Sequence, residues 1–235
     1  MVSAASDQPK RGGENIARAL LLWAGALAAT AIAVAISIVR LDHPTALWVH
    51  HHHTEMPPGR LEWLAVHVGN PLIPLAELVL LGVVVRAAVF RALPQGHYAA
   101  AFVASLSVLT AEGVKRFLKP IFGRTSPETW INANSSSTQN GYYGFHFWHG
   151  GAAYQSFPSG HMATACALIA VLWIWYPRWR WLYFAAVLSV GGALVGTNIH
   201  FMSDVIAGAF VGISVGAAVT AIWNRISSIK QVPSQ

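Results

Sequence analysis

Six long apolar runs constrain this chain more than any other feature of its sequence. They lie at roughly 17–39, 68–91, 97–118, 159–177, 179–199 and 203–224. A helix needs about 20 apolar residues to cross a bilayer, and within lipid each backbone polar group has to be satisfied inside its own segment. We therefore predict an all-α fold, a polytopic membrane protein built as a bundle of six transmembrane helices.

The composition agrees with a membrane protein. Hydrophobic residues make up 54% of the 235 residues and charged residues only 10%, whereas soluble domains usually carry about 25% charge. The net charge of +6 raises the question of a nucleic-acid partner. The basic residues do not cluster in a soluble module, so we expect no nucleic acid. Cys166 lies in an apolar run and is expected to pack in the core.

The length suits one domain with two short tails. We predict a cytoplasmic N-terminal tail at 1–16, a transmembrane domain at 17–225 and a cytoplasmic C-terminal tail at 226–235. The first apolar run follows three basic residues, as in a signal peptide. That run is longer than the 7–15 apolar residues of a signal sequence, so we favour a retained anchor helix.

The distribution of Lys and Arg predicts the orientation, because cytoplasmic loops carry the excess of positive charge. With the N-terminus inside, nine of the fifteen Lys and Arg residues fall on the inner side, and four of the other six lie within 115–124. Both termini are therefore expected in the cytoplasm. The loop 119–158 and the junction of the fifth and sixth runs then share the outer face.

The outer loop 119–158 is long and rich in Gly, Asn, Ser and aromatic residues. Loops of this length are usually functional or disordered, and the aromatic content favours an ordered cap over a site. A second outer loop, 41–61, carries four consecutive histidines at 50–53. A metal site is one interpretation of that run, and a polar loop at the membrane interface is the one we favour.

Three outer segments carry residues with recognisable chemistry. The first, 119–127, contains the two cations Lys119 and Arg124. Arg offers a planar fork of donors for phosphate oxygens, and Lys offers a point charge. Read alone, the two could equally be cations that extend to the membrane interface.

The second segment, Pro158-Ser159-Gly160-His161, opens the fourth apolar run. Ser159 is a good helix N-cap, and Gly160 lets an anion approach the backbone N–H groups of a helix start. An ordinary cap explains Ser159 but leaves His161 in the first turn unexplained.

The third segment holds His200 and Asp204, which would lie one turn apart on one face of a helix. A carboxylate fixes the tautomer of an imidazole and stabilises its cation, as a histidine nucleophile requires. His161 on the facing segment could protonate a leaving group. Ionisable residues at the ends of membrane helices are costly and usually functional, although a structural His–Asp pair is the alternative.

In this order the three segments resemble the signatures of the type 2 phosphatidic acid phosphatase (PAP2) family, over about residues 97–222. The resemblance implies that His200 attacks phosphorus and becomes a phosphohistidine, that Asp204 orients it, and that His161 protonates the leaving alkoxide. It implies no metal and no other cofactor. It also implies four residues that hold the phosphate oxygens: Lys119, Arg124, Ser159 and Gly160.

The chain departs from the family pattern at two places. The first signature usually ends in Arg-Pro, and here Ser126 precedes the proline, so Arg124 would take over. The third signature usually has Ser-Arg before its histidine, and here Ala193 and Leu194 stand there. One phosphate-binding arginine therefore has no counterpart, for which Lys115 could partly compensate.

We expect a membrane lipid phosphatase that hydrolyses a phosphomonoester or diphosphate of a lipid at the outer membrane face. Its partners would be the lipid phosphate substrate and the surrounding membrane lipids. A phosphotransferase with the same site and a non-catalytic lipid-binding relative remain open as alternatives. A transporter would carry its ionisable residues nearer the membrane midplane.

Overall fold

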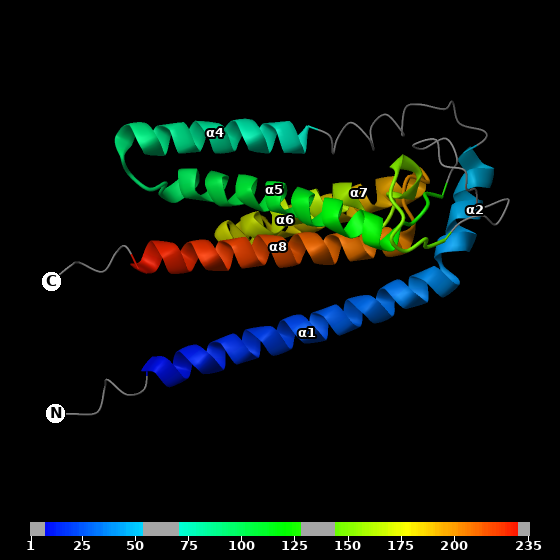
Figure 1. Cartoon of the computed structure of the whole chain (residues 1–235), viewed down its shortest axis with the longest axis horizontal. Helices are drawn as coiled ribbons and strands as arrows, with labels where there is room; N and C mark the ends of the chain where they lie inside the picture. Colours follow the sequence, from blue (N-terminus) through cyan, green and yellow to red (C-terminus); the bar gives the residue numbers. More distant parts are fainter. Residues whose placement is uncertain (1–7, 54–70, 128–143, 230–235) are drawn as a thin grey trace.

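The computed structural model describes residues 8–53, 71–127 and 144–229, and these residues are almost entirely helical (Figure 1). The elements are α1 (Gln8–Arg40), α2 (Asp42–His53), α4 (Leu72–Phe90), α5 (Gly96–Phe122), η1 (Ala152–Tyr154), α6 (Gly160–Trp175), η2 (Pro177–Trp179), α7 (Arg180–Gly196) and α8 (Met202–Ile229).

A helix occupies each of the six predicted apolar runs, so the predicted all-α membrane fold is confirmed. Among the described residues, four segments are long and apolar enough to cross a membrane: 16–40, 72–90, 177–196 and 202–228. The predicted count of six spans therefore differs from the four helices that meet both criteria among the described residues. Helix α6 has 16 residues, and α5 carries charged side chains in its last turns.

Large apolar side chains cover the outside of the helices. Leu21, Val39, Val89 and Trp181 are each at least 70% exposed. Contiguous apolar surface of this extent is unfavourable in water, and lipid is the solvent in which it costs nothing. The protein is therefore an integral membrane protein, and its stability comes from packing between helices.

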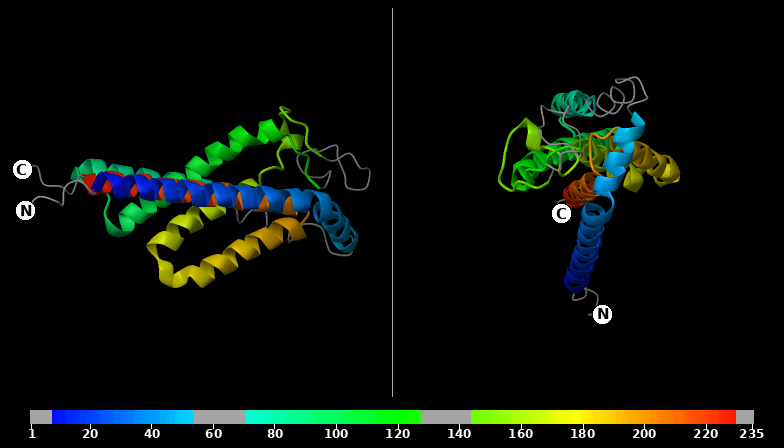
Figure 2. Two further views of the ribbon diagram at one scale, coloured as in Figure 1. Left: turned by 90° about the horizontal axis from the view of Figure 1, so that it is seen from below. Right: turned by 90° about the vertical axis from the view of Figure 1, so that its right-hand side faces the viewer.

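Helices α5, α6 and α8 form the centre of the bundle, with α4 against α5 and α7 against α6. Helix α1 lies outside this group and contacts α8 (Figure 2). The Trp23 indole donates a hydrogen bond to Ser214 Oγ at 3.1 Å, and the Trp23 ring lies 5.9 Å from that of Phe210. The described ends of α1 and α8, Gln8 and Ile229, lie at the same end of the bundle (Figure 1).

The contact between α6 and α8 depends on glycine. Gly208, Gly212 and Gly216 recur every four residues and so share one face of α8. A Cβ on Gly212 would come within 2.2 Å of the backbone oxygen of Ala163. Small residues let membrane helices approach closely, where van der Waals contact replaces the hydrophobic drive available in water.

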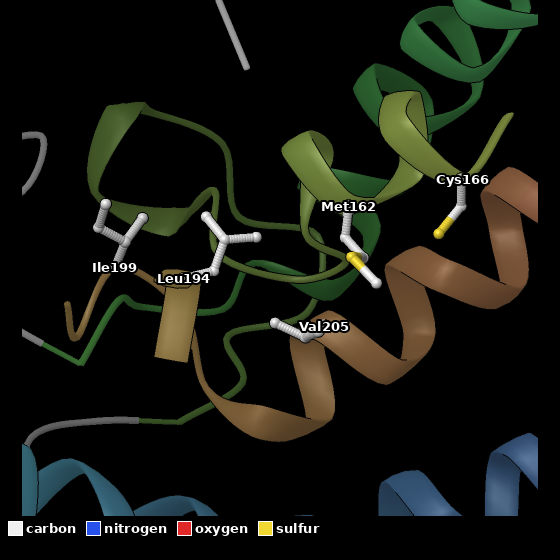
Figure 3. Close-up of a cluster of buried hydrophobic side chains, with 5 residues drawn as sticks. All are labelled: Met162, Cys166, Leu194, Ile199 and Val205. Atoms are coloured by element: carbon white, nitrogen blue, oxygen red, sulfur yellow. The ribbon is translucent and has the colours of Figure 1, made fainter. Parts of the chain in front are cut away.

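A buried apolar cluster lies where α6, α7 and α8 meet (Figure 3). It contains Met162, Cys166, Leu194, Ile199 and Val205, each at most 6% exposed. Cys166 is fully buried in this cluster, as predicted. Leu194 stands where the family pattern has arginine. Here the position is part of the apolar core, and an unpaired guanidinium there would be strongly unfavourable.

The structure differs from the sequence-based prediction at several helix boundaries. Helix α1 begins at Gln8, not near 17, and α8 ends at Ile229, not near 224. Two further differences lie near the site. Residues 42–53 form helix α2, which lies across one end of the bundle where a loop was predicted (Figure 1). Helix α5 continues to Phe122, four residues beyond its predicted end, so Lys119 lies in its last turn. Ion pairs from Glu112 to Lys115 and Arg116, at i+3 and i+4, stabilise the turn of α5 that precedes this extension.

The glycine contact predicts that Gly212→Ala will destabilise the protein. The added methyl group would overlap the backbone of α6, and overpacking of this kind costs about 1–3 kcal/mol. The thermal unfolding temperature in detergent should fall. Gly192→Ala is the matched control, because a Cβ at Gly192 meets no atom within 4 Å. Equal unfolding temperatures for the two variants would contradict this account of α6–α8 packing.

Candidate active site

The residues singled out by the sequence come together at one end of the bundle. This is the end where α5 finishes and where α6 and α8 begin, with α2 beside them (Figure 1). Residues 128–143 of the predicted cap lie outside the described residues, while 144–158 lie against the site. The predicted convergence of three distant segments is thus present in the fold.

Gly123 turns the chain from α5 into the site. It ends the helix with φ of +52°, a left-handed conformation that glycine adopts without strain. A Cβ there would lie 1.9 Å from the backbone oxygen of His146. Arg124 then forms isolated bridges with Phe145 and Gln155. These contacts hold its backbone between the two parts of the returning loop.

The start of α6 has the predicted cap. Ser159 is the N-cap, and its Oγ accepts a hydrogen bond from the backbone N–H of Met162 at 3.4 Å. The Ser159 N–H donates to the backbone oxygen of Asp204 at 3.0 Å, which joins the start of α6 to the start of α8. The N-terminal N–H groups of α6 therefore point into the site end of the bundle.

His200 and Asp204 form the predicted pair. His200 Nδ1 lies 3.5 Å from Asp204 Oδ2. The same carboxylate oxygen accepts hydrogen bonds from Ser156 Oγ at 2.6 Å and from the Phe201 N–H at 3.0 Å. Because Nδ1 faces this carboxylate, Nε2 is the ring nitrogen available on the opposite edge. Burial lowers the pKa of His200, an effect that Asp204 opposes, so the neutral form of the imidazole is favoured at neutral pH.

His161 faces His200 from the first turn of α6. The two ring centroids lie 6.3 Å apart, with the planes inclined at 63°. His161 is half-buried, whereas His200 is 6% exposed. Two imidazoles in this relation could act from opposite sides of one small group.

Two lysines of α5, Lys115 and Lys119, lie near His161 and the start of α6. Lys115 Nζ lies 2.6 Å from Glu112 Oε2, and its side chain is only 16% exposed. It packs directly against Gly160, where a Cβ would meet Lys115 Nζ at 2.6 Å. Lys119, one turn further, is half-buried and lies within electrostatic range of both His161 and His200. The N-terminus of α6 thus has two lysine side chains close to its backbone N–H groups.

Arg124 is buried in an ion-pair network and is 1% exposed. Its Nη2 donates to Asp42 Oδ2 at 2.6 Å, and its Nη1 donates to Asp204 Oδ1 at 2.6 Å and to the hydroxyl of Ser203. The rings of Phe145 and Phe201 lie 4.7 and 4.3 Å from the guanidinium carbon. Nε has no hydrogen-bond partner among the described residues, so this nitrogen is one that a phosphate oxygen could meet.

Sequence reasoning gave no role to three of the polar residues that surround the motif side chains. Ser156 and Ser203 are fully buried and bind the Asp204 carboxylate and the Arg124 guanidinium, respectively. Asp42 comes from the chain after the first span and reaches the same network. The sequence feature that could have drawn attention to Asp42 is an acidic residue two positions after an apolar helix. Such a residue is by itself typical of a membrane interface.

The described residues contain no group of three or more His, Cys, Asp or Glu side chains placed to hold a metal ion. Two carboxylates at the site, Asp42 and Asp204, are both paired with Arg124, and Glu112 is paired with Lys115 and Arg116. Within the described part of α2, His52 stacks on Trp48 with centroids 4.3 Å apart, and His50 lies edge-on to His51.

Two curated proteins are similar to part of the chain. A stretch of 95 residues is 35% identical to a lipid A 1-phosphatase of Rhizobium etli, and covers 40% of this chain and 38% of that protein. The corresponding enzyme of Rhizobium johnstonii is 34% identical over 95 residues, which is 40% of this chain and 36% of the relative. The chain thus matches well under half the length of these relatives.

A solved structure is also similar, the transmembrane PAP2-type phosphatidylglycerolphosphate phosphatase of Bacillus subtilis. The alignment covers 87% of this chain and 96% of that one, with a TM-score of 0.48 and 18% identity. The sequence also matches the PAP2 superfamily over residues 98–228, more than half of the chain and all three motif segments. The chain therefore belongs to the PAP2 superfamily.

Proposed function

We propose that this protein is a membrane lipid phosphatase that hydrolyses a phosphomonoester or diphosphate of a lipid through a phosphohistidine at His200. The observation that carries the proposal is the convergence of His161, His200 and Asp204 beside two lysines and the N-terminus of α6. This arrangement supplies a nucleophile, a proton donor and positive charge around one phosphate-sized group.

The first chemical step begins at His200 Nε2, whose lone pair attacks phosphorus while the bond to the leaving oxygen breaks. Asp204 holds Nδ1 and stabilises the positive charge that develops on the ring. His161 gives its proton to the leaving oxygen. The negative charge of a bound phosphate favours the protonated form of His161 before this step.

The second step returns the enzyme to its starting state. His161, now neutral, accepts a proton from water, and the water oxygen attacks phosphorus and breaks the bond to His200 Nε2. Inorganic phosphate leaves. If an alcohol replaces the water, the same intermediate gives a phosphotransferase, so the acceptor alone distinguishes the two activities.

The phosphate oxygens would be held by Lys119, by the backbone N–H of Gly160 and by Lys115. The Ser159 N–H, which sequence reasoning included, donates to the backbone oxygen of Asp204 instead, so Ser159 would act as the helix cap. Lys115 lies against Gly160 and would supply a cation near the start of α6. It would partly replace the family arginine, whose position is occupied here by Leu194 in the apolar core. Arg124 could add a contact through Nε. These positively charged and N–H groups would stabilise the negative charge that is spread over the three equatorial oxygens of the phosphoryl group during transfer.

The site would face the outer side of the membrane, with both termini in the cytoplasm. The distribution of Lys and Arg supports this orientation, and the ends of α1 and α8 lie at the end of the bundle away from the site (Figure 1). A lipid A phosphate is the first substrate to test, because the two Rhizobium relatives are lipid A 1-phosphatases. Phosphate release from a panel of lipid phosphates by the detergent-purified protein tests the function.

His200→Ala and His161→Ala should differ in kind. Without His200 no phosphoenzyme forms, so an aryl phosphate and an alkyl lipid phosphate should both cease to be hydrolysed. Without His161, an aryl phosphate should retain more activity, because its leaving group needs protonation less. The two substrates are compared by kcat/KM on each variant. An equal factor lost on both substrates in His161→Ala would mean that His161 is not the general acid.

Catalysis should persist in excess chelator and should be inhibited by vanadate. The proposed site neutralises phosphate with lysines and backbone N–H groups. Its carboxylates are already paired with Arg124, Lys115 or Arg116, whereas Mg²⁺ and Ca²⁺ require free oxygen ligands. The measurement is the rate of phosphate release with and without chelator. Activity that chelator abolishes and added Mg²⁺ restores would contradict this mechanism.

Lys115→Met should lower kcat/KM roughly ten- to a hundredfold, the usual effect of losing one hydrogen bond to a charged group. Arg116→Met is the matched control. Arg116 pairs with the same Glu112, but its side chain is 75% exposed, so its loss should leave kcat/KM almost unchanged. Similar losses in both variants would show that Lys115 acts through Glu112 or through folding, and not on the phosphate.

A further inference from the structure

Asp42 is a buried carboxylate that the proposed mechanism does not use. It is the first residue of α2 and is 2% exposed. An ionised carboxylate away from water costs several kcal/mol unless it is paired and hydrogen-bonded. Asp42 is fully paired, and its partners Ser203 and Arg124 belong to the active-site end of the bundle.

Both oxygens of Asp42 bind groups next to the catalytic pair. Oδ1 accepts a hydrogen bond from the Ser203 N–H at 3.0 Å, in the first turn of α8. Oδ2 accepts from Ser203 Oγ at 2.5 Å and from Arg124 Nη2 at 2.6 Å. Asp42 therefore satisfies one of the free N–H groups at the start of α8, the turn that also carries Asp204.

Arg124 connects Asp42 to Asp204. The planar guanidinium donates to one carboxylate through Nη2 and to the other through Nη1, both at 2.6 Å. Phe145 and Phe201 lie close to the guanidinium. Because the fork is rigid, a displacement at the Asp42 side also displaces the nitrogen that binds Asp204.

Asp42 also changes the net charge of the buried group formed by Arg124, Asp42 and Asp204. One guanidinium between two carboxylates leaves a net charge of −1, which is available to stabilise the imidazolium that forms when His200 attacks. If Arg124 were paired with Asp204 alone, the pair would be neutral and would offer His200 less stabilisation. In a buried site such differences act strongly, because the local dielectric constant is low.

We propose that Asp42 is a positioning residue for catalysis, which acts through Arg124 to fix the place and the effective charge of Asp204 and thereby orients His200. The inference rests on the proposed function, and it adds a residue from the first third of the chain, outside the matched family region of residues 98–228. The first span and α2 would then be part of the catalytic unit, beyond their role as an anchor.

The test compares the wild type with Asp42→Asn in the detergent-purified full chain, with an aryl phosphate as probe. Asn keeps the size and the acceptor for Ser203 but removes the charge. We expect kcat per folded molecule to fall roughly ten- to a hundredfold, as for a small misplacement of a catalytic group, while KM changes little because Asp42 does not touch the phosphate. A purely structural residue would lower the yield of folded protein and leave kcat per folded molecule unchanged.

A double variant tests whether the effect passes through Arg124. If it does, Asp42→Asn combined with Arg124→Gln should be no slower than Arg124→Gln alone, since the two residues act as one unit. Multiplied losses in the double variant would overturn the inference. If Asp42→Asn does not give monodisperse protein, Asp42→Glu replaces it, because it keeps the charge but moves the carboxylate by one methylene group. Its kcat must then fall at unchanged KM, and an unchanged kcat overturns the inference.

The two proposals fail in different ways. A wild type that releases no phosphate from any lipid or aryl phosphate overturns the proposed function and this inference with it. An active wild type whose Asp42→Asn variant keeps its kcat overturns the inference alone.

Discussion

The guanidinium of Arg124 lies between the carboxylates of Asp42 and Asp204, and the geometry of the site end depends on this buried contact. A cation that is 1% exposed is tolerable only because both terminal nitrogens meet anions, and removing Arg124 would leave two buried carboxylates without their cation. The contact joins α2, the end of α5 and the start of α8. Hence the His200–Asp204 pair is placed by electrostatics as much as by helix packing.

The bilayer imposes the second constraint. The outer surfaces of the helices face lipid, so association between helices relies on close contact, as at the glycine stripe of α8 against α6. Among the described residues, the buried acidic and basic side chains are concentrated at one end of the bundle. A lipid phosphate suits such a place, because its head group can enter a charged site while its apolar chains stay in the membrane.

Much of the fold and the motif residues could be predicted from the sequence. Apolar length gave the helices, and the cap at Ser159 and the one-turn spacing of His200 and Asp204 follow from local helix geometry. The catalytic roles of these residues stay predictions. Asp42 could not be found, because a lone acid after a span has no local pattern that indicates a partner 82 residues away. Helix α2 was missed because its histidines and Pro44 have no helical apolar period.

The central claim is that His200 carries the phosphoryl group during turnover. The most direct test is a rapid alkaline quench of the wild-type protein with a labelled lipid phosphate, followed by mass spectrometry of the peptides under conditions that preserve phosphohistidine. The account predicts a phosphoryl group on the peptide that contains His200, and its absence from His200→Ala. Label on another residue, or turnover with no labelled peptide at any quench time, would contradict it.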